Sequence, residues 1–375
     1  MLADDLVRRG RHVLTVCNAC RYCEQYCPVF PALEKRRTFA AEDLTYLANL
    51  CHNCGECLYA CQFAPPHEFG INVPMVLAEA RAQSYEAYAW PFALGRAFAS
   101  NAFRTTLAAL TMVVSMLVLV SLASPEALWS SDGAANFYGV IPHAAMVTLF
   151  GAVSLFVLIA LAISGSRFWR DVPHRAEAVA TAPTFPRWLK PALYAASSSA
   201  RRAVRDALTL RHLHATGRDC TSNLEVRLPW RRWFHHCTFY GFLLCMASTT
   251  VAAIYHGVFG WYAPYAYSSL PVLLGAAGGF GLLVGPLGLA ALRHTRDPAL
   301  GHEESGGLDA VFLALLFLTS LTGLALLVLR HSPLMGPLLI LHLAIVLVLL
   351  LTLPYGKFVH GLYRVLALIR YHRER

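Results

Sequence analysis

Eight of the eleven cysteines lie between positions 17 and 61, in two groups with the same internal spacing. The first group is Cys17-x2-Cys20-x2-Cys23-x3-Cys27, and the second is Cys51-x2-Cys54-x2-Cys57-x3-Cys61. Three thiolates at i, i+3 and i+6 can bind three corners of an iron–sulfur cubane, while the fourth cysteine points toward the other cluster. The spacing therefore predicts two [4Fe–4S] clusters that exchange their fourth ligands. The predicted sets are Cys17, Cys20, Cys23 and Cys61 for one cluster, and Cys51, Cys54, Cys57 and Cys27 for the other.

The main alternative for so many thiols is a pair of structural zinc sites. Such sites usually take cysteines as two separated pairs, so that a loop can close a tetrahedron. Four cysteines within eleven residues, twice over, do not have that arrangement. No apolar signal segment precedes Cys17. We therefore expect this region to stay in the cytoplasm, where clustered thiols are more often metal ligands than disulfides.

The remainder of the chain has the composition of a membrane protein. The sequence is 57% hydrophobic and 14% charged, whereas soluble domains carry about 25% charged residues. A bilayer core needs roughly 20 apolar residues per helix, and six uncharged stretches of suitable length follow position 100. We predict a mainly α-helical protein, with an α-helical ferredoxin-like 2[4Fe–4S] domain at 1–91 and a six-helix transmembrane bundle at 92–375. The expected spans are 105–125, 138–165, 234–257, 270–292, 308–329 and 334–360.

The distribution of Lys and Arg predicts the orientation of these spans. The connection 166–232 holds thirteen basic residues against five acidic ones, whereas the loops after the first and third spans hold no Lys or Arg. Because basic loops stay in the cytoplasm, we expect both termini and the cysteine domain on that side. Part of the connection, with Arg201, Arg202 and Arg205 among apolar residues, fits either a helix lying on the inner leaflet or a solvated basic loop.

Histidines recur at both ends of two expected spans. His342 and His360 are eighteen residues apart, which is five turns and roughly 27 Å along one face of a continuous helix. His235 and His256 lie in the antiparallel third span, about 60° out of phase. This pattern predicts two haem b groups with two axial imidazoles each: an inner one bound by His235, or alternatively His236, with His360, and an outer one bound by His256 with His342. His143 has no evident mate in the sequence.

The two cysteine groups and the stretches 235–242 (HHCTFYGF) and 354–361 (PYGKFVHG) resemble the tricarballylate or citrate utilization protein B family along the whole chain. The membrane part is similar to the dihaem gamma subunit of respiratory nitrate reductase. The last helix of that subunit also bears two haem histidines, which His342 and His360 match. The partner helix departs from it, because His235 and His256 are about twice as far apart as the corresponding histidines.

The resemblance implies an oxidoreductase component of the bacterial inner membrane that has no catalytic side chain. It would reoxidise the reduced FAD of a partner tricarballylate dehydrogenase and pass electrons through two [4Fe–4S] clusters and b-type haem to a membrane quinone. Its expected partners are that flavoprotein, quinone and the lipid bilayer, with no nucleic acid. Arg21, Lys35, Arg36 and Arg37 could dock an acidic flavoprotein or form a solvated patch, and Tyr355, Lys357 and His143 are candidate quinone contacts.

Two other functions fit parts of the pattern. A membrane electron-transfer subunit of a heterodisulfide-type thiol reductase would carry the same clusters but serve a cysteine-rich partner. An iron–sulfur membrane anchor or redox sensor without haem would leave the histidines in structural roles. In each case the cofactors supply the chemistry, and the protein sets their positions and potentials.

Overall fold

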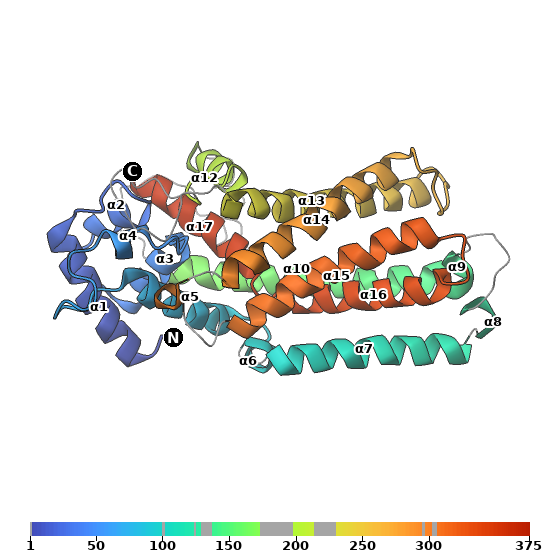
Figure 1. Cartoon of the computed structure of the whole chain (residues 1–375), viewed down its shortest axis with the longest axis horizontal. Coiled ribbons are helices and arrows are strands. Elements are labelled where there is room, and N and C mark those ends of the chain that lie inside the picture. The colour runs from blue at the N-terminus through green and yellow to red at the C-terminus, as the bar shows by residue number, and fades with distance from the viewer. Residues whose placement is uncertain are drawn as a thin grey trace, which may run out of the picture.

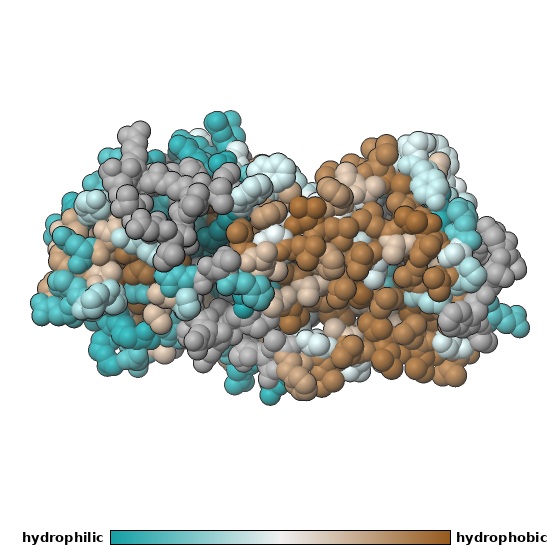
Figure 2. Space-filling view, viewed as in Figure 1, coloured by the Kyte–Doolittle hydropathy of each residue, from teal (hydrophilic) through white to brown (hydrophobic). Residues whose placement is uncertain are grey.

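The computed structural model describes residues 2–99, 102–123, 125–128, 137–172, 198–213, 230–294, 297–301 and 306–375. Within these ranges the regular elements are helices, and they form a head at one end of an elongated molecule and a bundle at the other (Figure 1). Figure 2 shows hydrophobic surface covering the bundle and mostly hydrophilic surface on the head. The predicted mainly α-helical architecture is therefore confirmed.

Five helices build the head around a small apolar core. They are α1 (Asp4–Cys20), α2 (Val29–Glu34), α3 (Ala41–Leu50), α4 (Glu56–Tyr59) and α5 (Val73–Tyr88). Asp4 and Asp5 in the first turn of α1 suit the positive end of its dipole, and the Asn72 side chain caps α5 by accepting from Met75 N at 3.0 Å. Leu14 and Leu77 are fully buried between these helices, so the head has its own hydrophobic core.

Six long apolar helices form the bundle and make this a multi-pass membrane protein. They are α7 (Ala102–Ala123), α10 (His143–Asp171), α13 (Trp230–Gly257), α14 (Leu270–His294), α15 (Gly306–Leu329) and α16 (Met335–Thr352). Short helices connect them: α6 (Phe92–Ala99), α8 (Pro125–Leu128), α9 (Phe137–Val140), α12 (Ser198–Leu208) and the 3-10 helix η1 (Pro298–Leu300). Apolar side chains such as Leu122 and Val328 point outward, as expected of helices that face lipid.

Helices α13 and α14 make the closest contact in the bundle. A Cβ on Gly241 would lie 2.8 Å from the carbonyl oxygen of Gly278, and a Cβ on Gly278 would lie equally close to that of Gly241. Small residues at such positions let two backbones approach within van der Waals distance. The glycines of the fourth span therefore serve helix packing.

The sixth span differs from its predicted extent of 334–360. Helix α16 ends at Thr352, a turn follows, and a separate helix, α17 (Val359–Glu374), begins at Val359. Pro354 lacks the amide hydrogen that a continuing helix needs, and the Thr352 carbonyl instead accepts from the amides of Tyr355 and Gly356. The expected single helix is therefore wrong, and the five-turn spacing of its two histidines does not apply.

Helix α17 leaves the bundle and packs into the head. Glu374 accepts a hydrogen bond from Arg36 at 3.0 Å and one from the Tyr46 hydroxyl at 3.3 Å. Arg36 also pairs with Asp43 at 2.6 Å, and its side chain is 1% exposed. Removing one partner of such a buried pair costs about 3–5 kcal/mol. The suggestion that Arg36 belongs to a surface docking patch is therefore wrong, because it anchors α17.

The other connections at the head end also contact the head. Asn72 Nδ2 donates to the Ala299 carbonyl at 2.9 Å, and the Tyr59 hydroxyl lies 3.2 Å from Asp297 Oδ2. Helix α12 packs on α17. Figure 1 shows α8 and α9, which lie between the first two spans, at the opposite end. The connections after the second and fourth spans therefore lie at the same end as the head. Residues 173–197 and 214–229 of the basic connection lie outside the described ranges.

Candidate functional site

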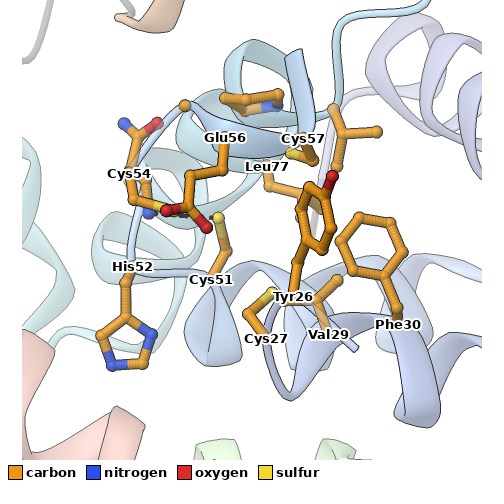
Figure 3. Close-up of a pocket in the computed structure, with 14 residues that line it drawn as sticks. Tyr26, Cys27, Val29, Phe30, Cys51, His52, Cys54, Glu56, Cys57 and Leu77 are labelled. Carbon is orange, nitrogen blue, oxygen red and sulfur yellow. Dashed lines mark hydrogen bonds between the residues drawn. The ribbon is translucent and has the colours of Figure 1, made fainter. Parts of the chain in front are cut away.

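The second cysteine group lines one pocket together with the last cysteine of the first group. Cys51, Cys54 and Cys57 come from the segment between α3 and the first turn of α4, and Cys27 precedes α2. Figure 3 shows the sulfurs of Cys27, Cys51 and Cys57 directed into a common space. The backbone turns there through Asn53 (φ 53°) and Gly55 (φ 89°), conformations that a glycine adopts without strain.

The remaining cysteines of the first group line a neighbouring pocket together with Cys61. Cys17 and Cys20 lie in the last turn of α1, Cys23 lies in the turn that follows, and Cys61 comes after α4. Cys57 borders both pockets. The two pockets thus bring together the sets that the spacing pairs, with the fourth cysteine exchanged.

Burial disfavours the thiolate form of two of these cysteines, Cys17 and Cys27. It raises the pKa of Cys17 to about 12, with Cys61, Cys23 and Cys20 nearby adding to the effect. It also raises the pKa of Cys27 well above its usual value, with Cys54 and Cys51 as the neighbours that contribute. No three Cys, His, Asp or Glu side chains in the described ranges converge on a single ion. The sulfurs surround a space, as a cubane requires, and metal binding would release their protons.

Three arginines from three helices hold the backbone around Cys51. Arg81 of α5 and Arg364 of α17 both donate to the Cys51 carbonyl, at 2.7 and 2.6 Å. Arg231 of α13 donates to the His52 and Asn53 carbonyls, both at 3.0 Å. Two of these helices carry a histidine one turn away from their arginine. These histidines are His235 on α13 and His360 on α17. No sequence pattern predicted this contact, because Arg231 and Arg364 near the ends of the spans were interpreted only as topology signals.

Those two histidines face each other at the head end of the bundle. The ring centroids of His235 and His360 are 6.0 Å apart, with an angle of 76° between the ring planes. His360 donates through Nδ1 to the Lys357 carbonyl, which fixes its tautomer and leaves Nε2 as the acceptor. His235 Nδ1 is buried and has no hydrogen-bond partner among the described residues. His236 instead stacks on Tyr240 at 5.6 Å, so His235 is the residue of this pair that faces His360.

The far end of the bundle is arranged differently from the expected His256–His342 pair. His256 stacks on His143 with ring centroids 3.6 Å apart, and its Nδ1 lies 3.2 Å from the Tyr138 hydroxyl. His342 lies 3.0 Å from the Thr322 hydroxyl of α15. Within the described residues no ring contact or hydrogen bond joins His256 to His342. The break after Thr352 removes the register on which that pairing was based.

His143 is the histidine that the sequence analysis left without a mate. Helical periodicity relates residues of one helix and cannot pair residues of α10 with residues of α13. The available signal was topology, since His143 begins the second span and His256 ends the third, which places both at the same end of the bundle. The other quinone candidates also have protein partners: the Tyr355 hydroxyl donates to the Trp90 carbonyl at 3.2 Å, and Lys357 pairs with Asp309 at 2.8 Å.

Comparison with known proteins identifies the family to which these two regions belong. Residues 99–375 match the family model of citrate utilization protein B, and residues 10–87 match that of its Fer4-like domain. The chain belongs to the citrate utilization protein B family. It is 44% identical over 364 residues to the citrate utilization protein B of Escherichia coli, which covers 97% of this chain and 91% of that relative. No solved structure matches. In this member of the citrate utilization protein B family, the head is thus an iron–sulfur domain on a membrane bundle.

Proposed function

We propose that this protein reoxidises the reduced FAD of a partner tricarballylate dehydrogenase and passes the electrons through two [4Fe–4S] clusters and b-type haem to a membrane quinone. One observation carries the proposal. The helices that hold the Cys51 loop through Arg231 and Arg364 are the helices that present His235 and His360 to each other. A redox site in the head and a ligand pair in the bundle therefore share one rigid connection.

The cysteine sets suit this role. Cys17, Cys20, Cys23 and Cys61 would hold one cluster, and Cys51, Cys54, Cys57 and Cys27 the other. When bound, these clusters and the haem accept and release single electrons. Cys20 is exposed, whereas Cys51 is buried. Figure 1 shows α1, whose last turn carries Cys17 and Cys20, at the end of the head away from the bundle, which supports docking of a flavoprotein beside the first set.

The His235–His360 pair suits an axial haem position. The two imidazoles come from different helices, and His360 has its Nδ1 fixed by a carbonyl. His235 has a buried Nδ1 for which the described part of the chain supplies no hydrogen-bond partner. Such a carbonyl contact orients a ligating imidazole. The outer haem is not proposed with His256 and His342 as its ligands, because their rings contact other residues. One haem per chain, at the head end, is the form of the proposal that fits the geometry.

The substrate and the membrane side rest on separate arguments. The E. coli relative carries the name citrate utilization protein B, and the resemblance adds a flavoprotein that acts on tricarballylate. The excess of Lys and Arg in the connections at the head end supports a cytoplasmic head, by the positive-inside rule. A flavoprotein in the cytoplasm would then meet the exposed Cys20 side of the head directly.

The first experiment compares neighbouring histidines in protein purified without oxygen. We expect pyridine haemochrome analysis to give one haem b per chain, His235→Ala to lose it, and His236→Ala to keep it. Both variants should retain two [4Fe–4S] signals in electron paramagnetic resonance (EPR) spectra and should differ in quinone reduction by the reduced flavoprotein. Full quinone reduction by His235→Ala would contradict the haem assignment, and wild-type protein without [4Fe–4S] signals would contradict the function as a whole.

A further inference from the structure

Two of the arginines at the Cys51 loop place positive charge in the head without a carboxylate partner. Arg81 is 8% exposed and Arg364 is half-buried, and neither forms an ion pair within the residues that the structure describes. Other arginines of the head behave differently, since Arg9 pairs with Glu79 and Arg36 with Glu374. A guanidinium removed from water needs a nearby negative charge to offset its desolvation. The buried carboxylate of Glu56 lines the pocket beside Cys51, so Arg81 and Arg364 together with Glu56 leave a net positive charge that an anion would offset.

The neighbouring groups indicate where that anion lies. Both guanidiniums donate hydrogen bonds to the carbonyl of Cys51. The Cys51 thiol lines one pocket with the thiols of Cys27, Cys54 and Cys57, which we call the second pocket because it would hold the second cluster. Four thiolates around one cluster carry more negative charge than its iron core offsets, and reduction adds one further negative charge. The arginines thus stabilise the reduced form more than the oxidised form.

The first pocket, which Cys17, Cys20, Cys23 and Cys61 line, has no buried arginine among its described lining residues. Arg21 is the one basic residue among the described residues that line it. Its side chain is exposed and donates to the Asn18 carbonyl at 3.1 Å. Cys20 is exposed as well. Water and salt screen an exposed charge far more than a buried one, so Arg21 favours a reduced cluster less than Arg81 and Arg364 do.

We propose that Arg81 and Arg364 raise the reduction potential of the cluster at Cys27, Cys51, Cys54 and Cys57 above that of the cluster at Cys17, Cys20, Cys23 and Cys61. This inference rests on the proposed function. One electron passes from the first cluster to the second. The first cluster is thereby oxidised by one electron and the second is reduced by one electron, and no proton is transferred between them. The reduced flavin is the donor and quinone the final acceptor. The arginines thereby make transfer toward the histidine pair downhill.

The test is an EPR-monitored redox titration of the full-length protein. In the wild type we expect the signal that changes in Cys54→Ser to have the higher midpoint and the signal that changes in Cys20→Ser the lower. The opposite order would overturn the proposal. If the wild type contains no [4Fe–4S] clusters, the proposed function fails instead, so the two failures are distinguishable.

Charge variants then test the arginines themselves. Arg81→Gln and Arg364→Gln should each raise the ratio of oxidised to reduced second cluster about tenfold at the wild-type midpoint, which is 59 mV for a one-electron couple. Arg81→Lys and Arg364→Lys keep the charge and should shift it much less. The first cluster and the exposed control Arg8→Gln should not change. If one glutamine variant loses its cluster, the other still decides the question, and equal shifts in the Lys and Gln variants would contradict a charge effect.

Discussion

The two ends of the helix bundle both carry histidines, but they place them differently. At the head end, His235 and His360 face each other at 6.0 Å across two helices. At the far end, His143 and His256 stack face to face at 3.6 Å, and His342 contacts Thr322. Rings stacked at 3.6 Å leave no space between them for the proposed haem, whereas the wider separation of His235 and His360 could accommodate it. The comparison indicates that the head, through Arg231 and Arg364, fixes the geometry of the end it touches.

The largest expected effect separates the two ends directly. His360→Ala should lose the proposed haem and lower quinone reduction by at least about 100-fold. Removing a group that only hydrogen-bonds to a metal ligand already costs about 10–100-fold, and removing the ligand itself should cost more. His342→Ala should keep the haem and most of the activity. Haem content and quinone reduction measured on both variants give the result. Equal loss in both variants would mean that the far end also binds haem.

A second prediction compares two glycines with left-handed backbones. A Cβ on Gly55 (φ 89°) would lie 2.8 Å from the Leu300 side chain, whereas one on Gly260 (φ 67°), near the far end, would meet nothing within 4 Å. Gly55→Ala should destabilise the loop of the second cluster by about 1–3 kcal/mol, and Gly260→Ala should leave that loop unaffected. The rate at which a chelator removes the second cluster's EPR signal is the measurement. The same rate in both variants would exclude a role of the Leu300 contact.

The stacked pair at the far end should contribute to stability alone. His143→Ala removes a ring contact that is worth about 1 kcal/mol, so we expect a small fall in thermal stability with unchanged haem content. His143→Phe keeps a ring and should retain most of the stability. A loss of haem in His143→Ala would show that the far end binds the cofactor after all.

The smallest effect concerns pH at the packing of α12 on α17. Burial disfavours the Asp206 carboxylate, but the hydrogen bond from His372 and the nearby His212 outweigh it, so the pKa of Asp206 lies below its usual value. A lowered carboxyl pKa contributes stability above the unfolded-state pKa of about 3.9, and that contribution is lost as the pH falls below it. Limited proteolysis of α12 should therefore accelerate as the pH falls below about 4. Asp206→Asn should be cut at the accelerated rate throughout, and an unchanged rate in this variant would contradict the prediction.

Local patterns in the sequence were sufficient for much of the architecture. The predicted cysteine sets line the two pockets, apart from Cys57, which borders both, and the uncharged stretches predicted six spanning helices. The break at Thr352 was missed although Pro354 and Gly356 mark it, because hydropathy alone continues to His360. His143 and the arginines at the Cys51 loop were missed for another reason. Their partners lie on other helices, and neither periodicity nor charge counting within one segment identifies contacts between segments.

The contact between Arg36 and Glu374 joins positions 338 residues apart in the chain. A ribosome synthesises the head first, yet the head cannot complete its packing until all six spans have been made and inserted. The folding intermediate that waits at the membrane therefore holds the eight cysteines of the head without α17 or Arg364 against the Cys51 loop. Loading of the second cluster in its final environment becomes a late event in biogenesis, after membrane insertion. A fully packed iron–sulfur head thereby marks a chain whose membrane domain is already in place.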